Sequence, residues 1–236
     1  MADLPIKPIT LYSGPLSMYG AKCQIAAIEK GLPVQVVLVP FTQEHLYQPK
    51  HPEVLRINPK GQVPVLVHGD VEIFDSTQIF EYFEDLQPNP PLWPRFRVPR
   101  AKARMLELKA DEVFFAQVIR LMGLQHCLSD PLAQQAIAAL ERYYGELENL
   151  LIDREYLADD YGYADIAFFM AQLFATRLGA PMSARTTRLL AWRARVARRT
   201  AVRAVIQQIN ETLAQQGLPV PAFMLEATAA QSVGNV

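Results

Sequence analysis

The stretch that decides the fold is INPKGQVPVL, residues Ile57–Leu66. A proline at position 64 begins an apolar run, and proline is tolerated at the first residue of a strand. A cis peptide bond between Val63 and Pro64 would turn the backbone of Val63 outward. The stretch therefore predicts the start of a strand, preceded by a backbone group that is open to a ligand.

A strand pair and a helix follow. Pro64–Val67 and Val71–Phe74 are separated by His-Gly-Asp at 68–70, which is short enough for a hairpin. Asp75 and Ser76 then start a helix, whose N-terminus and serine hydroxyl can hold a carboxylate, while the aspartate can accept from an ammonium group. The apolar face of this helix repeats at three-to-four spacing and consists of Ile79, Phe80 and Phe83.

Upstream, the pattern predicts a β-α-β unit. Ile9–Leu11 and Val34–Val39 are typical of short buried strands, and Lys22–Gly31 is typical of a helix that Gly31 ends. Parallel strands joined by a helix form a right-handed crossover. Ser17 lies just ahead of this helix, so its hydroxyl and the unpaired amides behind it can face an anion such as a thiolate.

A proline-rich segment at 87–99 separates two kinds of periodicity, because its five prolines at 88, 90, 91, 94 and 99 interrupt both helix and sheet. Residues 8–86 read as an α/β domain and 100–225 as an all-helical domain, with a disordered tail at 226–236. The later helices are expected at Ala164–Leu178, Thr186–Arg199 and Ala201–Gln216.

Composition favours a small-molecule partner. The chain has 236 residues, half of them apolar, and a net charge of −1, which gives no field for nucleic acid or for an anionic membrane. Cys23 and Cys127 have neither disulfide-framework nor zinc-site spacing. The start lacks a signal-peptide pattern and no apolar run reaches the ~20 residues of a spanning helix, so we expect a cytoplasmic protein with no membrane association.

Two further features have ordinary explanations. Seven arginines and no acidic residue occur between Arg185 and Arg203, which favours a solvated basic face over nucleic acid or an acidic protein partner. Several aromatic and methionine side chains of the second domain are more typical of a core than of a site for an electrophile. They are Phe114, Phe115, Met122 and Tyr161–Tyr163.

The chain resembles the glutathione transferase superfamily over roughly residues 8–216. The resemblance rests on Asn-Pro-x-Gly-x-Val-Pro at 58–64, on Asp-Ser at 75–76 and on the Glu-Tyr-Phe-Glu end of the helix that follows. It implies a thioredoxin-like α/β domain followed by an all-helical bundle, glutathione as cosubstrate, no metal and a homodimer. Gly162-Tyr163-Ala164-Asp165-Ile166 resembles the capping box of the family's second domain, with glycine in place of serine or threonine.

The resemblance also implies site residues. Val63, next to Pro64, would pair its backbone with the cysteinyl part of glutathione. Asp75 and Ser76 would hold the γ-glutamyl end, and Lys50 and Gln62 match positions that contact the glycine carboxylate. Ser17 matches the serine that stabilises the thiolate in the serine-type classes.

Alternatives remain open for the thiolate donor and for the reaction. Tyr12, Ser13 and Tyr19 also lie near positions of catalytic groups, and the absence of cysteine at 17 and 19 argues against cysteine-dependent chemistry. The first hypothesis is transfer of glutathione to an apolar electrophile. Others are a glutathione-dependent disulfide reductase, an isomerase, an enzyme that cleaves aryl ethers, and a non-catalytic protein of this fold that acts through protein or nucleic-acid partners.

Overall fold

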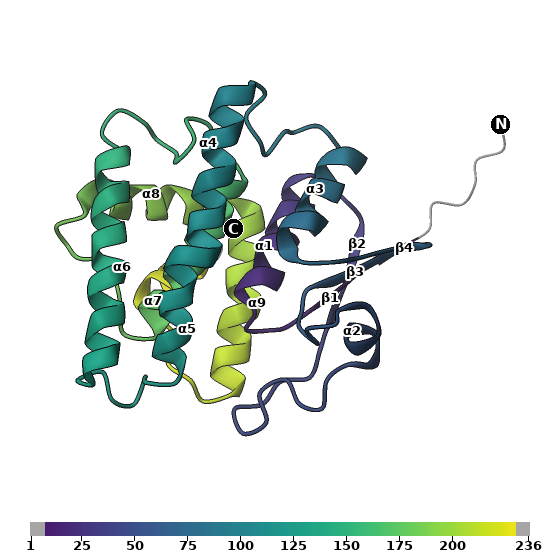
Figure 1. Cartoon of the computed structure of the whole chain (residues 1–236), viewed down its shortest axis with the longest axis horizontal. Coiled ribbons are helices and arrows are strands. Elements are labelled where there is room, and N and C mark those ends of the chain that lie inside the picture. The colour runs from purple at the N-terminus through teal and green to yellow at the C-terminus, as the bar shows by residue number, and fades with distance from the viewer. Residues whose placement is uncertain (1–7, 230–236) are drawn as a thin grey trace, which may run out of the picture. The chain divides into compact units, whose positions relative to one another are not determined.

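The computed structural model describes residues 8–229 and divides the chain into two compact units (Figure 1). The first unit is the chain up to Pro90 together with Glu211–Leu218, and the second is Pro91–Asn210 together with the chain from Pro219 onward. The break falls inside the proline-rich segment. The assignment of Glu211–Leu218 to the first unit has no signal in the sequence.

The first unit contains a four-stranded mixed sheet in the order β2-β1-β3-β4. Its strands are β1 Ile9–Ser13, β2 Val34–Leu38, β3 Val65–His68 and β4 Val71–Phe74. β1 runs parallel to β2, while β3 is antiparallel to both β1 and β4. The predicted β-α-β unit and hairpin, and with them the α/β class of this part of the chain, are confirmed.

Helices α1 Met18–Glu29 and α3 Ser76–Leu86 pack against each other and lie on one side of the sheet in Figure 1. α1 begins directly after Ser17, four residues earlier than the periodicity indicates. It ends as predicted, because Gly31 adopts a positive φ of 64° and donates its amide to the carbonyl of Ile28. The predicted apolar face of α3 is fully buried.

A buried lysine joins the end of α1 to the end of the unit. Lys30 forms an ion pair with Glu84 of α3, and its ammonium group also donates to the carbonyls of Gln87 and Pro90, at 2.7 and 3.0 Å. An ammonium group can be buried when a carboxylate and hydrogen bonds replace its water. Lys30 therefore fixes the chain where it leaves the first unit.

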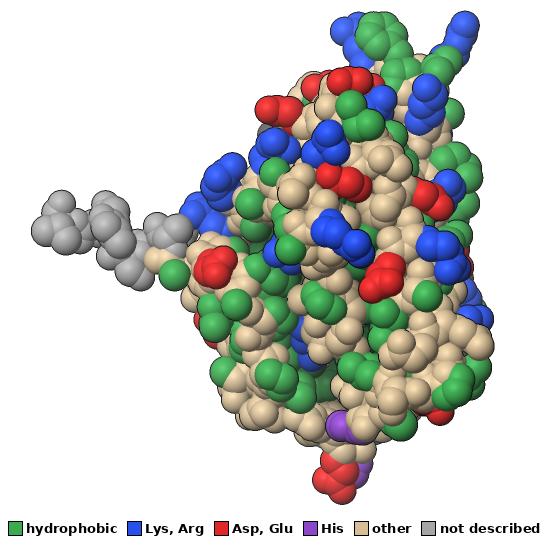
Figure 2. All heavy atoms as spheres, turned by 90° about the vertical axis from the view of Figure 1, so that its left-hand side faces the viewer, with side chains coloured by type: hydrophobic (Ala, Val, Ile, Leu, Met, Phe, Trp, Pro, Cys, Tyr) green, Lys and Arg blue, Asp and Glu red, His purple; other side chains and the backbone are tan. Residues whose placement is uncertain are grey.

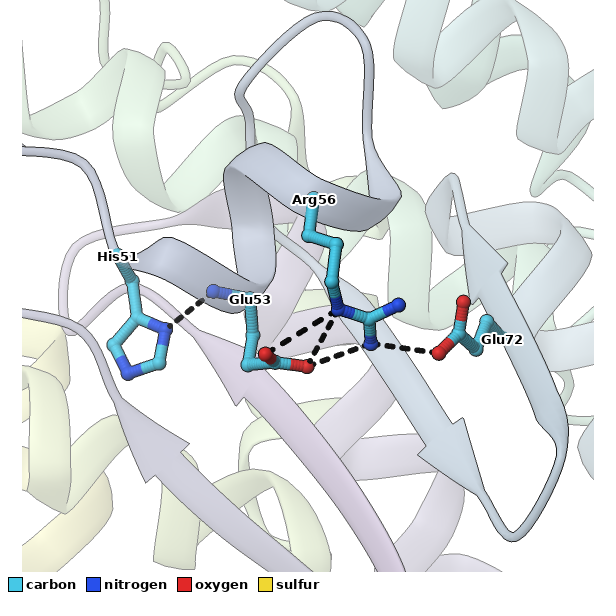
Figure 3. Close-up of polar contacts among 4 residues, drawn as sticks. All are labelled: His51, Glu53, Arg56 and Glu72. Atoms are coloured by element: carbon cyan, nitrogen blue, oxygen red, sulfur yellow. Dashed lines mark hydrogen bonds and ion pairs between the residues drawn. The ribbon is translucent and has the colours of Figure 1, made fainter.

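A short helix, α2 Pro52–Ile57, covers the other side of the sheet and was not predicted. Figure 3 shows how it is held: Arg56 binds Glu53 one turn earlier and also Glu72 of β4, with N–O distances of 2.7 and 2.6 Å. The ring nitrogen Nδ1 of His51 accepts from the amide of Glu53 and caps the helix. Because histidine is an uncommon cap and the helix has six residues, the helix-start signal of Pro52 and Glu53 is too short to stand out in the sequence.

The second unit is helical, as expected. Its elements are α4 Arg97–Leu108, the π-helical segment η1 Lys109–Phe114, α5 Phe115–Met122, α6 Pro131–Leu150, α7 Tyr163–Arg177, α8 Thr187–Ala197, α9 Thr200–Gln215 (whose last residues belong to the first unit) and α10 Ala222–Ala229. Every residue of α7 from Tyr163 to Ala175 is buried, so this helix forms the centre of the unit. No helix between residues 8 and 229 is both long and apolar enough to cross a membrane.

Two expectations about the ends of this unit are corrected. α4 begins at Arg97, inside the segment expected to be a linker. Pro99 lies in the first turn of this helix, where backbone amides have no partner within the helix, so its missing N–H group loses no hydrogen bond. Residues 226–229 belong to α10 rather than to a disordered tail. This helix is held by the burial of Met224, whose carbonyl accepts from Asn210. The remainder of the expected tail, residues 230–236, lies outside the described residues.

The aromatic residues of the second unit form a core. Phe114 lies within 5.5 Å of the ring centres of Tyr143, Tyr144 and Phe168, and Phe168 also contacts Trp192. Phe114, Phe115 and Tyr163 are buried, which supports their interpretation as core residues. Met122, by contrast, is 40% exposed.

Asp165 joins three parts of this core. Its Oδ1 accepts from the amide of Leu157 and from the indole nitrogen of Trp192, at 2.9 and 2.8 Å, and its Oδ2 accepts from the amide of Gly162 at 3.1 Å. The aspartate thus makes its half of a capping box, while Gly162 has no side chain for the other half. Complete burial raises the pKa of Asp165 to about 6, although the hydrogen bonds oppose this shift.

The cost of replacing Asp165 is therefore expected to depend on pH. A carboxyl group with a raised pKa in the folded state binds its proton more tightly there than in the unfolded chain. Its contribution to the free energy of unfolding is therefore fullest below pH ~4. This contribution falls by on the order of 3 kcal/mol as the pH rises through ~6. Asp165→Asn removes this titration. Urea unfolding of both proteins should show a larger loss from the substitution at pH ~4.5 than at pH ~7.5, and the opposite trend would refute a raised pKa.

Candidate functional site

The register of the sheet brings the three predicted polar stretches to one edge. Val65 at the start of β3 lies opposite Tyr12 near the end of β1 and opposite Phe74 at the end of β4. The segment after β1, the segment before β3 and the segment after β4 therefore leave the sheet at the same end. These segments carry Ser17, Val63 and Asp75 respectively.

Ser17 is the N-cap of α1. Its hydroxyl oxygen accepts from the amide of Gly20 at 3.1 Å, and within the described residues the hydroxyl proton is not donated to any acceptor. A hydroxyl has one proton and two lone pairs, so capping leaves the proton available for an anion. The side chain is partly exposed. Capping and donation to a thiolate are thus compatible at this position.

Among the alternative donors, Ser13 is the least accessible. Ser13 is completely buried, and its Oγ accepts from the side-chain amide of Gln24 at 2.9 Å. The ring of Tyr12 lies against His51, with ring centres 4.9 Å apart, beside the small core beneath α2. Tyr19 is partly exposed, and the ammonium group of Lys22 lies 5.7 Å from the centre of its ring.

The turn before β3 is built by Asn58, which is 4% exposed. Its side chain accepts from the amide of Lys60 at 2.9 Å and donates to the carbonyl of Gln62 at 2.6 Å. The Val63-Pro64 bond is cis, which is the condition under which the backbone of Val63 is expected to turn outward. The backbone amide and carbonyl of Val63 make no backbone hydrogen bond within the described part of the chain, so they are free to pair with a ligand.

Asp75 and Ser76 occupy the junction of β4 and α3. Asp75 is exposed, has a φ of 77° and caps α3, since its Oδ1 accepts from the amides of Thr77 and Gln78 at 3.0 and 3.2 Å. Its Oδ2 accepts no hydrogen bond within residues 8–229 and can receive an ammonium group. Ser76 is only 1% exposed, and its carbonyl accepts from the thiol of Cys23 in α1 at 3.5 Å.

In the part of the chain that the structure describes, Lys50 and Gln62, the two residues expected at the glycine carboxylate, are not held by polar side-chain contacts. Lys50 is partly exposed in the loop before α2, and Gln62 is exposed. Neither side chain has a hydrogen bond or ion pair within the described residues. Nothing in the structure brings the two side chains together.

Tyr47 is a supporting residue that the sequence did not indicate. Its hydroxyl accepts from the amide of Leu16 at 3.2 Å, in the loop that leads to Ser17. The same ring passes so close to Gly14 that a Cβ there would lie 2.6 Å from it. Tyr47 therefore fixes this loop. Because more than thirty residues separate Tyr47 from the loop, no local sequence pattern indicates this contact.

Two family models match the chain: the N-terminal domain of glutathione S-transferase over residues 11–91 and the C-terminal domain over residues 114–200. Glutathione S-transferase 1 of Dianthus caryophyllus is 32% identical over 190 residues, covering 76% of this chain and 82% of that protein. The chain belongs to the glutathione S-transferase family. The thioredoxin-like fold of the first unit and the helical second unit agree with this membership.

Proteins with other names also resemble this chain. A stringent starvation protein A homolog of Coxiella burnetii is 34% identical over 109 residues, which is 45% of this chain, and the match spans only about half (48%) of that relative. FzlA from C. crescentus matches with a TM-score of 0.79 over 93% of this chain and 99% of its own, at 24% identity. Poplar glutathione transferase F1 matches with a TM-score of 0.72 over 86% and 99%, at 20% identity. These two structures support the fold alone.

The arginine-rich stretch contacts its own unit. Arg188 pairs with Glu148 at 3.2 Å, and Arg195 donates to the carbonyl of Glu155 at 2.7 Å. Arg199 and Arg193 lie over the rings of Tyr161 and Phe223, at 3.6 and 4.3 Å from their centres. On the face shown in Figure 2, basic side chains are interspersed with acidic ones. These contacts give several of the arginines a structural role.

Proposed function

We propose that the protein is a glutathione transferase that binds glutathione along the site edge, defined as the segments carrying Ser17, Val63 and Asp75. The convergence of a free hydroxyl, a free backbone pair and a free carboxylate oxygen, in a chain of this family, is the observation that supports it. The backbone of Val63 pairs with the cysteinyl residue of glutathione, and Asp75 receives the α-ammonium group. Ser76, Lys50 and Gln62 complete the binding set, and the reaction uses no metal.

Ser17 acts on the thiol. A thiol with a pKa near 8.5 is about 3% ionised at pH 7, and lowering the pKa to about 6.5 requires roughly 2.7 kcal/mol. A hydrogen bond to a charged acceptor supplies about 1.5–3 kcal/mol, and a helix N-terminus about 0.3–1 kcal/mol more. The Ser17 hydroxyl and the N-terminus of α1 together are therefore sufficient. The thiolate then attacks an apolar electrophile.

The reaction is tested by a substrate panel. With glutathione present, aryl halides and epoxides test transfer, a mixed disulfide tests reduction, a maleyl acid tests isomerisation and an aryl ether tests cleavage. Turnover of the halides or epoxides supports the transferase, whereas turnover of only one of the other substrates assigns the corresponding reaction. A homodimer in the cytoplasm is part of the same proposal.

A non-catalytic protein is the second candidate. It is favoured by the several relatives named as stringent starvation protein A homologs, which match with 26–34% identity. Such a protein would fold as described but would bind no glutathione. The free groups of the site edge argue against it, and failure of every substrate together with failure to bind glutathione would favour it.

Asp75→Asn is expected to weaken glutathione binding about tenfold or more, because a hydrogen bond to a charged group contributes about 1.5–3 kcal/mol. Asparagine caps helices as well as aspartate does and tolerates a positive φ, so α3 should stay intact. Calorimetric titration measures the change. Asp85→Asn, an exposed residue near the end of α3, changes the net charge equally and serves as the control. Equal weakening in both variants would remove Asp75 from the site.

A further inference from the structure

A cavity lies entirely within the second unit, between α8, α9 and α10, and has a volume of about 230 Å³. Its polar wall consists of Arg193 of α8, Arg198 of the turn after it, Arg203 of α9 and Glu226 of α10. Its apolar wall includes Leu190 and the ring of Phe223. The sheet and the site edge contribute nothing to this wall.

The cavity carries an excess of positive charge. Three guanidinium groups face one carboxylate, and none of the three forms an ion pair within residues 8–229. The Nε of Arg203 is shielded from water and has no hydrogen-bond acceptor there. A buried donor without an acceptor costs about 1–3 kcal/mol, so Arg203 has unused hydrogen-bonding capacity beside the cavity.

Arg193 is also partly removed from water. Its guanidinium group lies 4.3 Å from the centre of the Phe223 ring, and burial lowers the pKa of Arg193 from its usual value. The nearby Glu226 opposes this shift but does not form an ion pair with Arg193. A desolvated cation next to an apolar ring interacts more strongly with an anion than a cation in bulk water does.

We propose that this arginine cavity binds a compact doubly charged oxyanion, namely a phosphate group, either free or carried on a small molecule. Guanidinium groups match the oxygens of phosphate with paired N–H donors. The charge excess of two suits a dianion better than a single carboxylate. The volume lies below the ~300–1,000 Å³ of pockets for drug-sized ligands, which favours a small anion. The site does not depend on glutathione chemistry.

The test is a calorimetric titration of the full chain with inorganic phosphate, phenyl phosphate, sulfate and acetate at constant ionic strength. Phosphate or phenyl phosphate should bind, sulfate should compete and acetate should bind at least tenfold more weakly. Tighter binding of phenyl phosphate than of inorganic phosphate would identify a phosphoester as the ligand and would indicate use of the apolar wall. The reverse order would identify free phosphate.

Arg203→Gln and Arg198→Gln should each weaken phosphate binding about tenfold or more. Arg198 is exposed, so Arg198→Gln should fold and gives the measurement if Arg203→Gln does not fold. Arg185→Gln is the matched control, because Arg185 belongs to the same basic stretch but does not line the cavity. The proposal is overturned if neither phosphate compound binds to the unaltered protein, or if Arg185→Gln weakens binding as much as the cavity variants do.

Discussion

Ser17→Ala should reduce turnover about five- to eightfold at pH ~6.5 while leaving the Kd for glutathione unchanged within about twofold. Without the hydroxyl, the pKa of the bound thiol should return from about 6.5 toward 8.5, which lowers the thiolate fraction about fiftyfold. A more basic thiolate is more nucleophilic, with a Brønsted coefficient of about 0.4–0.5, and this offsets part of the loss. The pKa is measured from the ultraviolet absorbance of the thiolate in the complex.

Ser17→Ala also removes the helix-capping bond to Gly20, which costs about 0.5–2 kcal/mol of stability. One control therefore keeps the cap, and a second tests a neighbouring donor. Ser17→Thr keeps both the cap and the proton donor, so it should restore turnover. Tyr19→Phe removes a neighbouring hydroxyl and should have little effect. If Tyr19→Phe raises the thiol pKa and Ser17→Ala does not, the thiolate donor is Tyr19.

Asp165→Ala should lower the free energy of unfolding at pH 7 by about 3 kcal/mol or more. The substitution leaves the amides of Leu157 and Gly162 and the indole nitrogen of Trp192 without their acceptor in the core. A buried donor without a partner costs about 1–3 kcal/mol, and part of the total is recovered because the aspartate itself is costly to bury. Urea unfolding gives the difference.

The control for Asp165 is Asp153→Ala, since Asp153 is exposed in the segment that follows α6. This variant should stay within about 0.5 kcal/mol of the unaltered protein. Asp165→Asn provides the measurement if the alanine variant does not fold, because asparagine keeps one acceptor oxygen. A loss below about 1 kcal/mol for Asp165→Ala would mean that the capping network contributes little to stability.

The sequence predicts those elements whose signals are local. The strands of the first unit follow apolar runs with turn residues between them, and the end of α1 follows from Gly31. The elements that it misses depend on distant contacts: Arg56 fixes α2 against β4, and burial of Met224 fixes α10. The π-helical segment η1 likewise has no local sequence signal.

In the candidate site, too, some residues have local sequence signals and others depend on distant contacts. Ser17 and Asp75 cap helices and are therefore recognisable from the residues around them, as is the cis Val63-Pro64 bond from its motif. Tyr47 supports the loop before Ser17 from a distant part of the chain. The arginine cavity arises only when α10 packs beside α8, so a linear pattern of seven arginines could not separate the three that line it from those bound elsewhere.

The most direct test of glutathione binding at the site edge is calorimetric titration of the protein with reduced glutathione, repeated with oxidised glutathione and with Ser76→Ala. We expect a Kd between micromolar and millimolar, corresponding to about −8 to −4 kcal/mol, that is weakened by the substitution. A preference for oxidised glutathione would move the reaction toward disulfide reduction. Absence of heat with both forms, in a protein that unfolds cooperatively, would contradict the account and leave the non-catalytic candidate.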